Sequence, residues 1–219
     1  MTRRIAAPLF ALSLLLALAM PGAAQRERTP IGRFGLSVHV GADADGEPSA
    51  ERVLLERWVH EASEHFAPAG IGFDLERVHA MPADSAVLRT ISDRHRLRPH
   101  LVDRQINVFV VSRIEDPHAS RATRRQAERQ GIELSGRLGG AHIPARGRRP
   151  ETYLIVNAGP SSISLTHELG HFFGAGHHAD PTNIMSYGRN RVRFDERQIR
   201  AFRHYGRRYV RQRILRPIR

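Results

Sequence analysis

The sequence predicts a mixed fold of the α+β class with α/β character, in which strands and helices follow one another along 219 residues. Apolar and polar residues alternate at residues 34–40 and again at residues 71–79, which is the period of a β-strand. The segment between them carries apolar residues at helical spacing. Residues 106–111 (INVFVV) are apolar at almost every position, which is typical of a central strand buried on both faces.

The first strand, residues 34–40 (FGLSVHV), is expected to be half-buried because its apolar residues alternate with polar ones. Ser49 is a suitable N-cap for a helix that runs from Ala50 to about Phe66. The predicted inward face of this helix consists of Val53, Leu54, Trp58, Val59, Ala62 and Phe66. Pro68 and Gly70 end the helix before the second strand, residues 71–79.

The middle of the chain is expected to hold a second helix, then the central strand, then a charged segment. Asp84 is the expected N-cap of this helix, which continues to about Arg96. Its predicted inward residues are Val87, Leu88 and Ile91. Residues 116–137 are charged and only weakly helical, so we interpret them as a solvated surface segment, with the rim of a cleft as the alternative.

The last part of the chain supplies two further strands and two helices. Leu138–Pro144 (LGGAHIP) is short, rich in glycine and ends in proline, which favours an edge strand. Residues 153–157 (YLIVN) form the last strand, just before the helix that carries the motif described below. A C-terminal helix is expected from Phe194 to about Arg213, and its candidate packing residues are Ile199, Phe202, Tyr205 and Val210.

The N-terminus has the pattern of a secretory signal peptide. Arg3 and Arg4 precede an uncharged apolar run, and small residues follow, so cleavage after Ala24 is expected. The apolar run is shorter than the ~20 residues of a membrane span, although an uncleaved anchor is the alternative. We therefore divide the chain into a signal peptide (1–24), a linker (25–33) and one domain (34–219), and expect a secreted or periplasmic protein.

The composition restricts the partners that the protein can have. The formal net charge is +12, and every basic residue is arginine. Such a surface can bind anionic material weakly, but no nucleic-acid-binding module is present, so no specific nucleic-acid partner is expected. The absence of cysteine excludes disulfides, and with them a thiolate that could block a metal site.

The strongest motif lies at residues 167–177 (HELGHFFGAGH). His167 and His171 are four residues apart, so they share one face of a helix and can direct two imidazoles at one ion. Glu168 follows the first histidine and can direct its carboxylate at a water molecule on that ion. A core helix that merely contains histidines is the alternative, but four of the 13 histidines lie within residues 167–178, which argues against it.

A third ligand cannot come from the next helical turn in good geometry, so the helix has to end. Gly174 can adopt a positive φ and reverse the chain, which lets His177 return to the ion. Three neutral imidazoles with one open position for water are the arrangement of a catalytic Zn²⁺ site. His178 is the alternative third ligand, although the spacing from Gly174 favours His177.

Eight residues after His177 comes Met185, followed by Ser186 and Tyr187. The long histidine motif together with this methionine resembles the metzincin zinc peptidases, in which the second feature is called the Met-turn. The resemblance implies a mostly parallel twisted sheet with an antiparallel edge strand, zinc on the active-site helix, and a C-terminal helix. It also implies that a protein or peptide substrate binds as an extended strand along the edge strand.

The resemblance further assigns roles to residues. Glu168 is implied to be the general base, and Met185 an apolar floor beneath the imidazoles. Tyr187 stands where some metzincins carry a tyrosine that binds zinc or stabilises the transition state, with a packing role as the alternative. His142 could line the cleft, and Asp180 either supports a ligand imidazole or caps the following turn.

The sequence thus predicts a secreted zinc-dependent endopeptidase. A selective exopeptidase with the same site is one alternative. Others are a zinc-bearing binding protein of the cell envelope that does not cleave, and a basic envelope-binding protein whose zinc is only structural.

Overall fold

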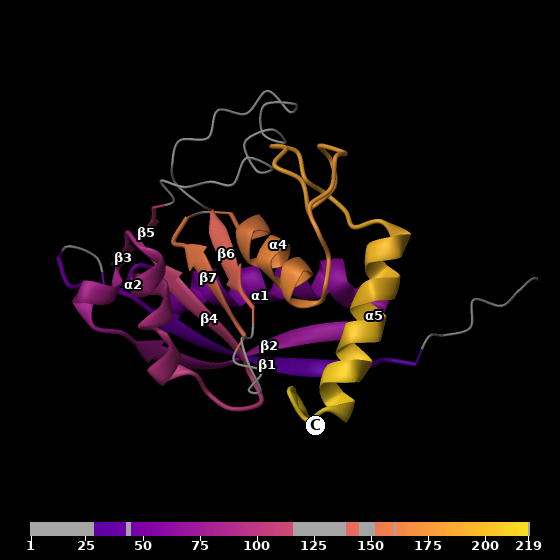
Figure 1. Ribbon diagram of the computed structural model, residues 1–219, viewed down its shortest axis with the longest axis horizontal. Helices are drawn as coiled ribbons and strands as arrows, with labels where there is room; N and C mark the ends of the chain where they lie inside the picture. The colour runs from indigo at the N-terminus through magenta and orange to yellow at the C-terminus, as the bar shows by residue number, and fades with distance from the viewer. Residues whose placement is uncertain (1–28, 43–44, 116–138, 145–151, 160, 219) are drawn as a thin grey trace, which may run out of the picture.

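The computed structural model describes residues 29–42, 45–115, 139–144, 152–159 and 161–218 (Figure 1). Its centre is a twisted sheet in the order β2-β1-β4-β7-β6, with β8 paired to β1. The strands are β1 (Gly32–Val40), β2 (Ile71–Ala80), β4 (Ile106–Val111), β6 (Gly140–Ile143), β7 (Tyr153–Asn157) and β8 (Pro217–Ile218). Strands β2, β1, β4 and β7 run parallel, whereas β6 runs antiparallel to β7. This confirms the predicted mixed fold, with a mostly parallel sheet and an antiparallel edge strand.

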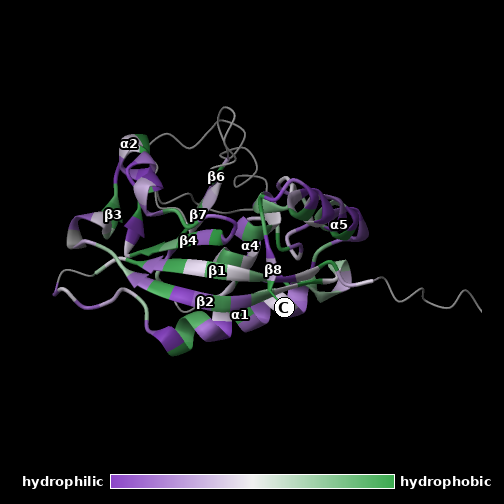
Figure 2. Cartoon of the chain, turned by 90° about the horizontal axis from the view of Figure 1, so that it is seen from below, coloured by the Kyte–Doolittle hydropathy of each residue, from purple (hydrophilic) through white to green (hydrophobic). Residues whose placement is uncertain are grey.

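The two faces of the sheet bury two different cores. Alternate side chains of β4 point to opposite faces, so Val108 and Val110 join the larger core while Phe109 and Val111 join the smaller one. The larger core is covered by α1 (Arg52–Phe66), α4 (Ile163–Phe172) and α5 (Glu196–Arg211). Seen from below, α1 lies alongside β2 and contains both hydrophilic and hydrophobic residues (Figure 2). The motif helix α4 packs on this face of the sheet against β6 and β7, and it also contacts α1.

Phe66 is the centre of an aromatic cluster that packs against the C-terminal end of α4. Its ring lies 4.7–5.6 Å, centroid to centroid, from the rings of four other phenylalanines. These are Phe73 on β2, Phe173 just after α4, Phe194 before α5 and Phe202 on α5. Aromatic pairs of this kind add roughly 0.5–1.5 kcal/mol each beyond the burial of their area. The end of α4 is thus attached to three separate elements.

The predicted helix at residues 84–96 is wrong. This region contains η2 (Ala83–Ser85), β3 (Val87–Leu88) and a short helix α2 (Ile91–His95). Strand β3 pairs in parallel with β5 (Arg113–Ile114), so contacts distant in sequence outweigh the local helical spacing. Thr90 then caps α2 by accepting from the Asp93 amide. Ile91, which was expected to face inward, is 66% exposed.

Strand β1 and the start of helix α1 also differ from the predictions. Strand β1 is buried along Phe34–Val40 rather than half-buried, because parallel strands flank it and both of its faces are covered. It begins at Gly32, so the last two residues of the predicted linker belong to the strand. Helix α1 begins at Arg52 after Glu51, and Ser49 instead donates to the Gly41 carbonyl.

The buried face of α1 is shifted by comparison with the prediction. Val53 is 74% exposed, and Leu55 takes its place in the core at 2%. The buried residues are Leu55, Trp58, Val59, Ala62 and Phe66, which follow the i, i+3, i+4, i+7 spacing of one helix face.

Helix α5 matches the predicted C-terminal helix, with slightly narrower bounds. Asp195 and Gln198 form a reciprocal capping box at its start. The expected packing residues of α5 all contact the larger core: Ile199, Phe202, Tyr205 and Val210. Among the described residues, no helix is both long and apolar enough to cross a membrane.

Several predictions fall outside the part of the chain that the structure describes. They are the signal peptide (1–24), the beginning of the linker (25–28), the whole charged segment (116–137), and Leu138 of the edge strand.

Candidate metal centre

Helix α4 carries the first two histidines of the motif. It packs against β6, β7 and α1, and its N-terminus is tied to α1 because the Ser162 hydroxyl donates to the Glu61 carboxylate. His167 and His171 lie one turn apart, with ring centroids 4.8 Å apart and ring planes at 82°. In-plane lone pairs on rings crossed in this way can converge on one point.

The chain reverses after α4 and brings back a third histidine. Gly174 has φ +88°, and a Cβ atom at this position would lie 2.2 Å from the ring of Tyr205, so only glycine fits here. The Nε2 atoms of His171 and His177 are 3.1 Å apart. One nitrogen from each of His167, His171 and His177, hereafter the histidine triad, lies within 4.8 Å of the other two.

Backbone carbonyls fix the orientation of the first two rings. His167 donates from Nδ1 to the Ile184 carbonyl at 2.7 Å, and His171 donates from Nδ1 to the Ala175 carbonyl at 2.8 Å. A proton on Nδ1 leaves the Nε2 lone pair available for a metal. The outer hydrogen bonds of these rings therefore select the tautomer that can bind an ion.

Burial keeps the histidine triad neutral. It lowers the pKa of His167 to about 3 and that of His177 to about 4, and the neighbouring His171 acts in the same direction on both. Burial also lowers the pKa of His171. Neutral imidazoles are the form that binds metal, so no proton has to leave before an ion enters at neutral pH. Three neutral imidazoles around one point fit a zinc ion.

Glu168 is buried next to the histidine triad, at the edge strand. Burial raises the pKa of its carboxyl group to about 8, while Arg191 and the backbone amide of His142 oppose that shift. The approach to β6 is close, because a Cβ atom on Gly140 would lie 2.7 Å from Glu168 Oε1. A cation held by the triad would favour the ionised carboxylate.

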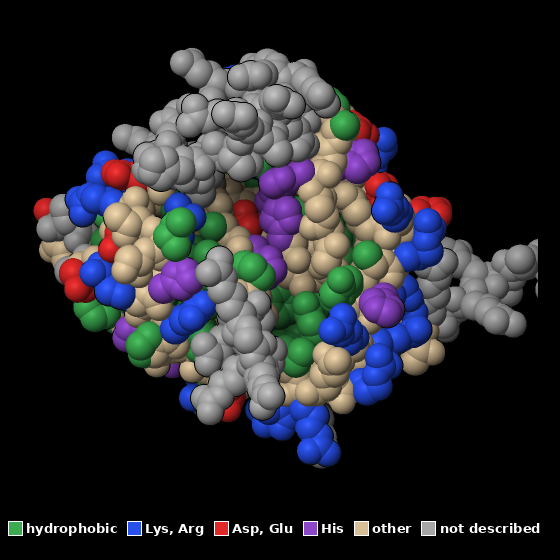
Figure 3. Space-filling model, viewed as in Figure 1, with side chains coloured by type: hydrophobic (Ala, Val, Ile, Leu, Met, Phe, Trp, Pro, Cys, Tyr) green, Lys and Arg blue, Asp and Glu red, His purple; other side chains and the backbone are tan. Residues whose placement is uncertain are grey.

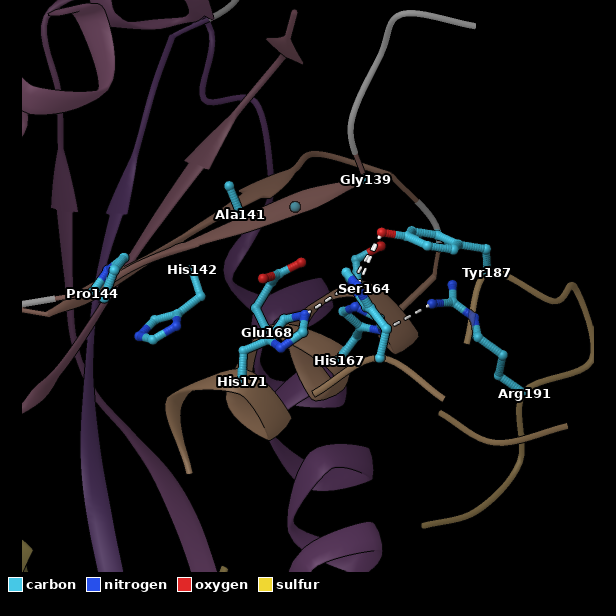
Figure 4. A pocket seen from close by; sticks show the side chains of 12 residues that line it. Gly139, Ala141, His142, Pro144, Ser164, His167, Glu168, His171, Tyr187 and Arg191 are labelled. Atoms are coloured by element: carbon cyan, nitrogen blue, oxygen red, sulfur yellow. Dashed lines mark hydrogen bonds between the residues drawn. The ribbon is translucent and has the colours of Figure 1, made fainter. Parts of the chain in front are cut away.

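The histidine triad and Glu168 open into one cavity of about 450 Å³. It is lined by β6 on one side, α4 beneath, and the loop that follows the turn at residues 183–186 on the other side (Figure 4). On the surface, histidine side chains gather in a hollow with an acidic group beside them (Figure 3). A cavity of this volume is within the size range of ligand-binding sites in proteins.

Met185 lies in a turn that hydrogen bonds connect to α5. Its side chain is fully buried, and its backbone amide donates to Asn183 Oδ1 at 2.8 Å. The Asn183 amide in turn donates to Gln198 of α5 at 2.9 Å. Because Ile184 in the same turn accepts from His167, the turn, α5 and the first imidazole form one connected unit.

Tyr187 follows this turn and lies at the edge of the histidine triad. Its hydroxyl is 3.1 Å from His177 Nε2 and 3.3 Å from His177 Nδ1, and the side chain lines the cavity (Figure 4). The hydroxyl therefore lies beside the third histidine at the wall of the cavity.

The other three candidate residues lie outside the triad. His178 turns away, and its Nε2 lies 3.3 Å from Asp195 Oδ2, so His177 is the residue that converges with the other two histidines. Asp180 Oδ1 accepts a hydrogen bond from the Thr182 amide at 2.8 Å, so Asp180 caps the turn as in the second of its two predicted roles. His142 lines the cavity, but its Nε2 interacts with a threonine hydroxyl.

Arg191 is a site residue that sequence reasoning missed. It lies in the loop at residues 189–193 and lines the cavity beside the histidine triad. Its Nη1 lies 3.4 Å from the Ser186 carbonyl oxygen. No local signal distinguishes it from Arg189 or Arg193, because the direction of its side chain depends on the path of the folded loop.

Known proteins resemble this chain only in their folds. No protein-family model matches it, and neither does any curated protein sequence. Among solved structures, it is similar to metalloproteinase-II from Bacteroides fragilis, with a TM-score of 0.54 and 12% sequence identity. The match covers 83% of this chain and 55% of that protein, so this chain spans about half of its length.

A chaperone–substrate complex also matches, with a TM-score of 0.49, 12% identity, and coverage of 81% of this chain and 38% of that one. Similarity at that level says nothing about function. The Bacteroides match shows a shared fold, so this chain has a metalloproteinase-like fold and, within it, three histidines that fit a zinc site.

Proposed function

We propose that this protein is a zinc-dependent endopeptidase of the metzincin type that is exported from the cell. The observation that carries the proposal is the convergence of the three imidazoles beside a buried carboxylate, within a cavity bordered by an edge strand. The metalloproteinase-like fold supports it, as do the motif at residues 167–177 and the methionine that follows.

The chain's own groups divide the work of hydrolysis. The histidine triad would hold a zinc ion, which would supply Lewis acidity for the scissile carbonyl and lower the pKa of water. Glu168 accepts the proton of the attacking water and delivers it to the leaving amine.

Tyr187 is proposed to donate a hydrogen bond to the carbonyl oxygen as negative charge develops on it. Its hydroxyl lies 3.1 Å from a triad nitrogen, so a carbonyl oxygen bound beside the triad would be within its reach. One such donor supplies ~3 kcal/mol of transition-state stabilisation in other enzymes.

The substrate is proposed to bind as an extended strand along β6. Within the described sheet, β6 is the terminal strand, and β7 is its only strand partner. The strand borders the cavity from Gly139 to Pro144, so a peptide added to this edge would run past the histidine triad.

The experiment is to compare wild type with Glu168→Gln, a variant of nearly the same shape. With zinc measured by elemental analysis, both proteins should hold about one ion per chain. Cleavage of a peptide library should be lost in the variant, by about 10³-fold or more. Full cleavage by Glu168→Gln would contradict the mechanism.

A wild type that holds zinc and cleaves nothing would favour the binding-protein alternative. Blocked and free peptide termini distinguish endopeptidase from exopeptidase activity. Export rests on the sequence of residues 1–24 alone, and N-terminal sequencing of protein from the periplasm or the medium tests it: a mature chain that still carries these residues would contradict cleavage.

A further inference from the structure

Arg191 places a positive charge at the wall of the candidate active site. The residue lies on the loop between Tyr187 and α5, and its guanidinium points toward His167 (Figure 4). Its Nη1 is 3.4 Å from the Ser186 carbonyl and 3.4 Å from His167 Nδ1. The latter nitrogen already donates its proton to the Ile184 carbonyl, so it cannot also accept from Arg191.

Much of the hydrogen-bonding capacity of this guanidinium is therefore unused. Its Nε atom is shielded from solvent and has no hydrogen-bond partner among the described residues. Within the same residues, no carboxylate lies in ion-pair distance of Arg191, in contrast to surface arginines such as Arg52 and Arg200. The acidic group that influences Arg191 electrostatically is Glu168, which is the proposed general base.

A partly buried cation without a counter-charge is costly, and a bound anion would offset the cost. A guanidinium presents parallel N–H groups that match the two oxygens of a carboxylate. Phosphate would fit the same fork, but the cavity runs beside an edge strand that suits a peptide, and peptides carry carboxylates.

We propose that Arg191 binds a carboxylate of the substrate close to the bond that is cleaved. The inference rests on the proposed peptidase function and specifies its substrate class: peptides with an acidic side chain near the scissile bond, or with their C-terminal carboxylate there. The first source makes the enzyme an endopeptidase selective for acidic residues. The second makes it a carboxypeptidase-like exopeptidase.

The test uses zinc-loaded protein and pairs of blocked peptides. Each pair differs only by aspartate or asparagine, placed in turn at the three positions on either side of the scissile bond. A further pair has a free or an amidated C-terminus. Wild type should cleave one member of one pair about tenfold faster in kcat/KM, as expected for a charge-assisted contact.

The variants assign that preference to a residue. In Arg191→Gln the ratio should fall to about one, and Arg191→Lys should retain part of it because the charge remains. Arg189→Gln is the matched control: it is exposed, belongs to the same loop and does not line the cavity, so its ratio should equal that of wild type. Zinc content is measured for each variant, because Arg191 lies beside a triad histidine.

Binding provides a readout that does not depend on turnover. The Kd values of the same peptide pairs are measured on the Glu168→Gln variant, with and without Arg191→Gln. The charged peptide should bind about tenfold more tightly only where Arg191 is present, and this difference should shrink with added salt.

Equal rates and equal Kd values for every pair would overturn the inference. A loss in Arg191→Gln that is the same for charged and neutral peptides would overturn it too, since it would indicate a role in holding the loop. In either case cleavage of neutral peptides would leave the peptidase proposal standing. If no peptide is cleaved, the proposed function fails, and the Kd values still decide whether Arg191 recognises carboxylates.

Discussion

Among the described residues, two groups of three neighbouring histidines can be compared, and the ligand atoms of only one of them converge on one point. The second group, hereafter the sheet histidines, consists of His39 on β1, His79 on β2 and His100 in η3 (Arg98–His100). The rings of His39 and His79 are stacked, with centroids 4.8 Å apart and planes at 15°. The first two rings of the histidine triad have the same spacing, but their planes cross at 82°.

This difference in ring orientation separates a ligand set from packing. Lone pairs lie in the plane of the ring, so crossed rings direct them at one point while stacked rings direct them past each other. Among the described residues, only the triad forms a group whose ligand atoms converge. The sheet histidines use their nitrogens elsewhere, since His39 interacts with Asn107 and His79 with Ser37.

The largest expected effect comes from removing one histidine from each group. His171→Ala should reduce bound zinc from about one ion per chain to almost none, because two imidazoles cannot hold a catalytic site. The matched change in the sheet, His79→Ala, should leave the zinc content unchanged. Elemental analysis after dialysis measures both, and zinc loss in His79→Ala would break the distinction between the two groups.

A second pair of changes sharpens the boundary of the triad itself. His177→Ala should lose most of the bound zinc, whereas His178→Ala should retain it, because His178 pairs with Asp195 instead. Zinc titration against a competing chelator gives the affinity of each variant. Equal affinities would mean that the two adjacent histidines exchange roles when the ion binds.

The two histidine groups also differ in how much of them can be predicted from sequence. His167 and His171 can be predicted as a pair because helical spacing is local in the sequence. Gly174 and His177 follow within six residues and extend the same pattern. The sheet histidines come from three elements that the sheet brings together, so no spacing reveals them. The same reason explains why β3 was mistaken for helix: its partner β5 lies about 25 residues further along the chain.

The sheet histidines should have a pH signature in stability. Burial lowers the pKa of His39 to about 4, with a weaker raising effect from Asn107 and lowering effects from His79 and His100. The unfolded chain therefore takes up this proton first, near pH 6.5. The contribution of neutral His39 to the free energy of unfolding is fully present above pH 6.5 and is lost as the pH falls towards 4. The loss amounts to up to about 2–3 kcal/mol.

Denaturant unfolding of zinc-free protein between pH 7 and 4 measures this contribution. The free energy of unfolding of His39→Phe should fall less steeply with decreasing pH than that of wild type, because the variant lacks the His39 imidazole. The histidine triad contributes equally to both proteins, so its contribution cancels in the comparison. His60→Gln, a change at an exposed histidine, should follow the wild-type curve. If the free energies of unfolding of wild type and His39→Phe depend on pH in the same way, the pKa of His39 is not lowered by folding.

Each histidine group has one aromatic neighbour at nearly the same distance, and this yields the prediction with the smallest effect. Phe109 lies 4.6 Å from His39 with its ring stacked at 18°, whereas Tyr187 lies 4.7 Å from His177 with its ring tilted at 46°. The tilt brings the Tyr187 hydroxyl to the two ring nitrogens of His177.

Tyr187→Phe should lower kcat by about tenfold, a modest share of what one transition-state donor can supply, and leave the zinc content and KM nearly unchanged. Tyr209→Phe is the control: it also removes a hydroxyl, one that donates to the Phe172 carbonyl at 2.9 Å, and should affect stability only. An unchanged kcat in Tyr187→Phe would give Tyr187 the role that Phe109 has beside His39. The contrast between the two groups would then lie in the imidazoles alone.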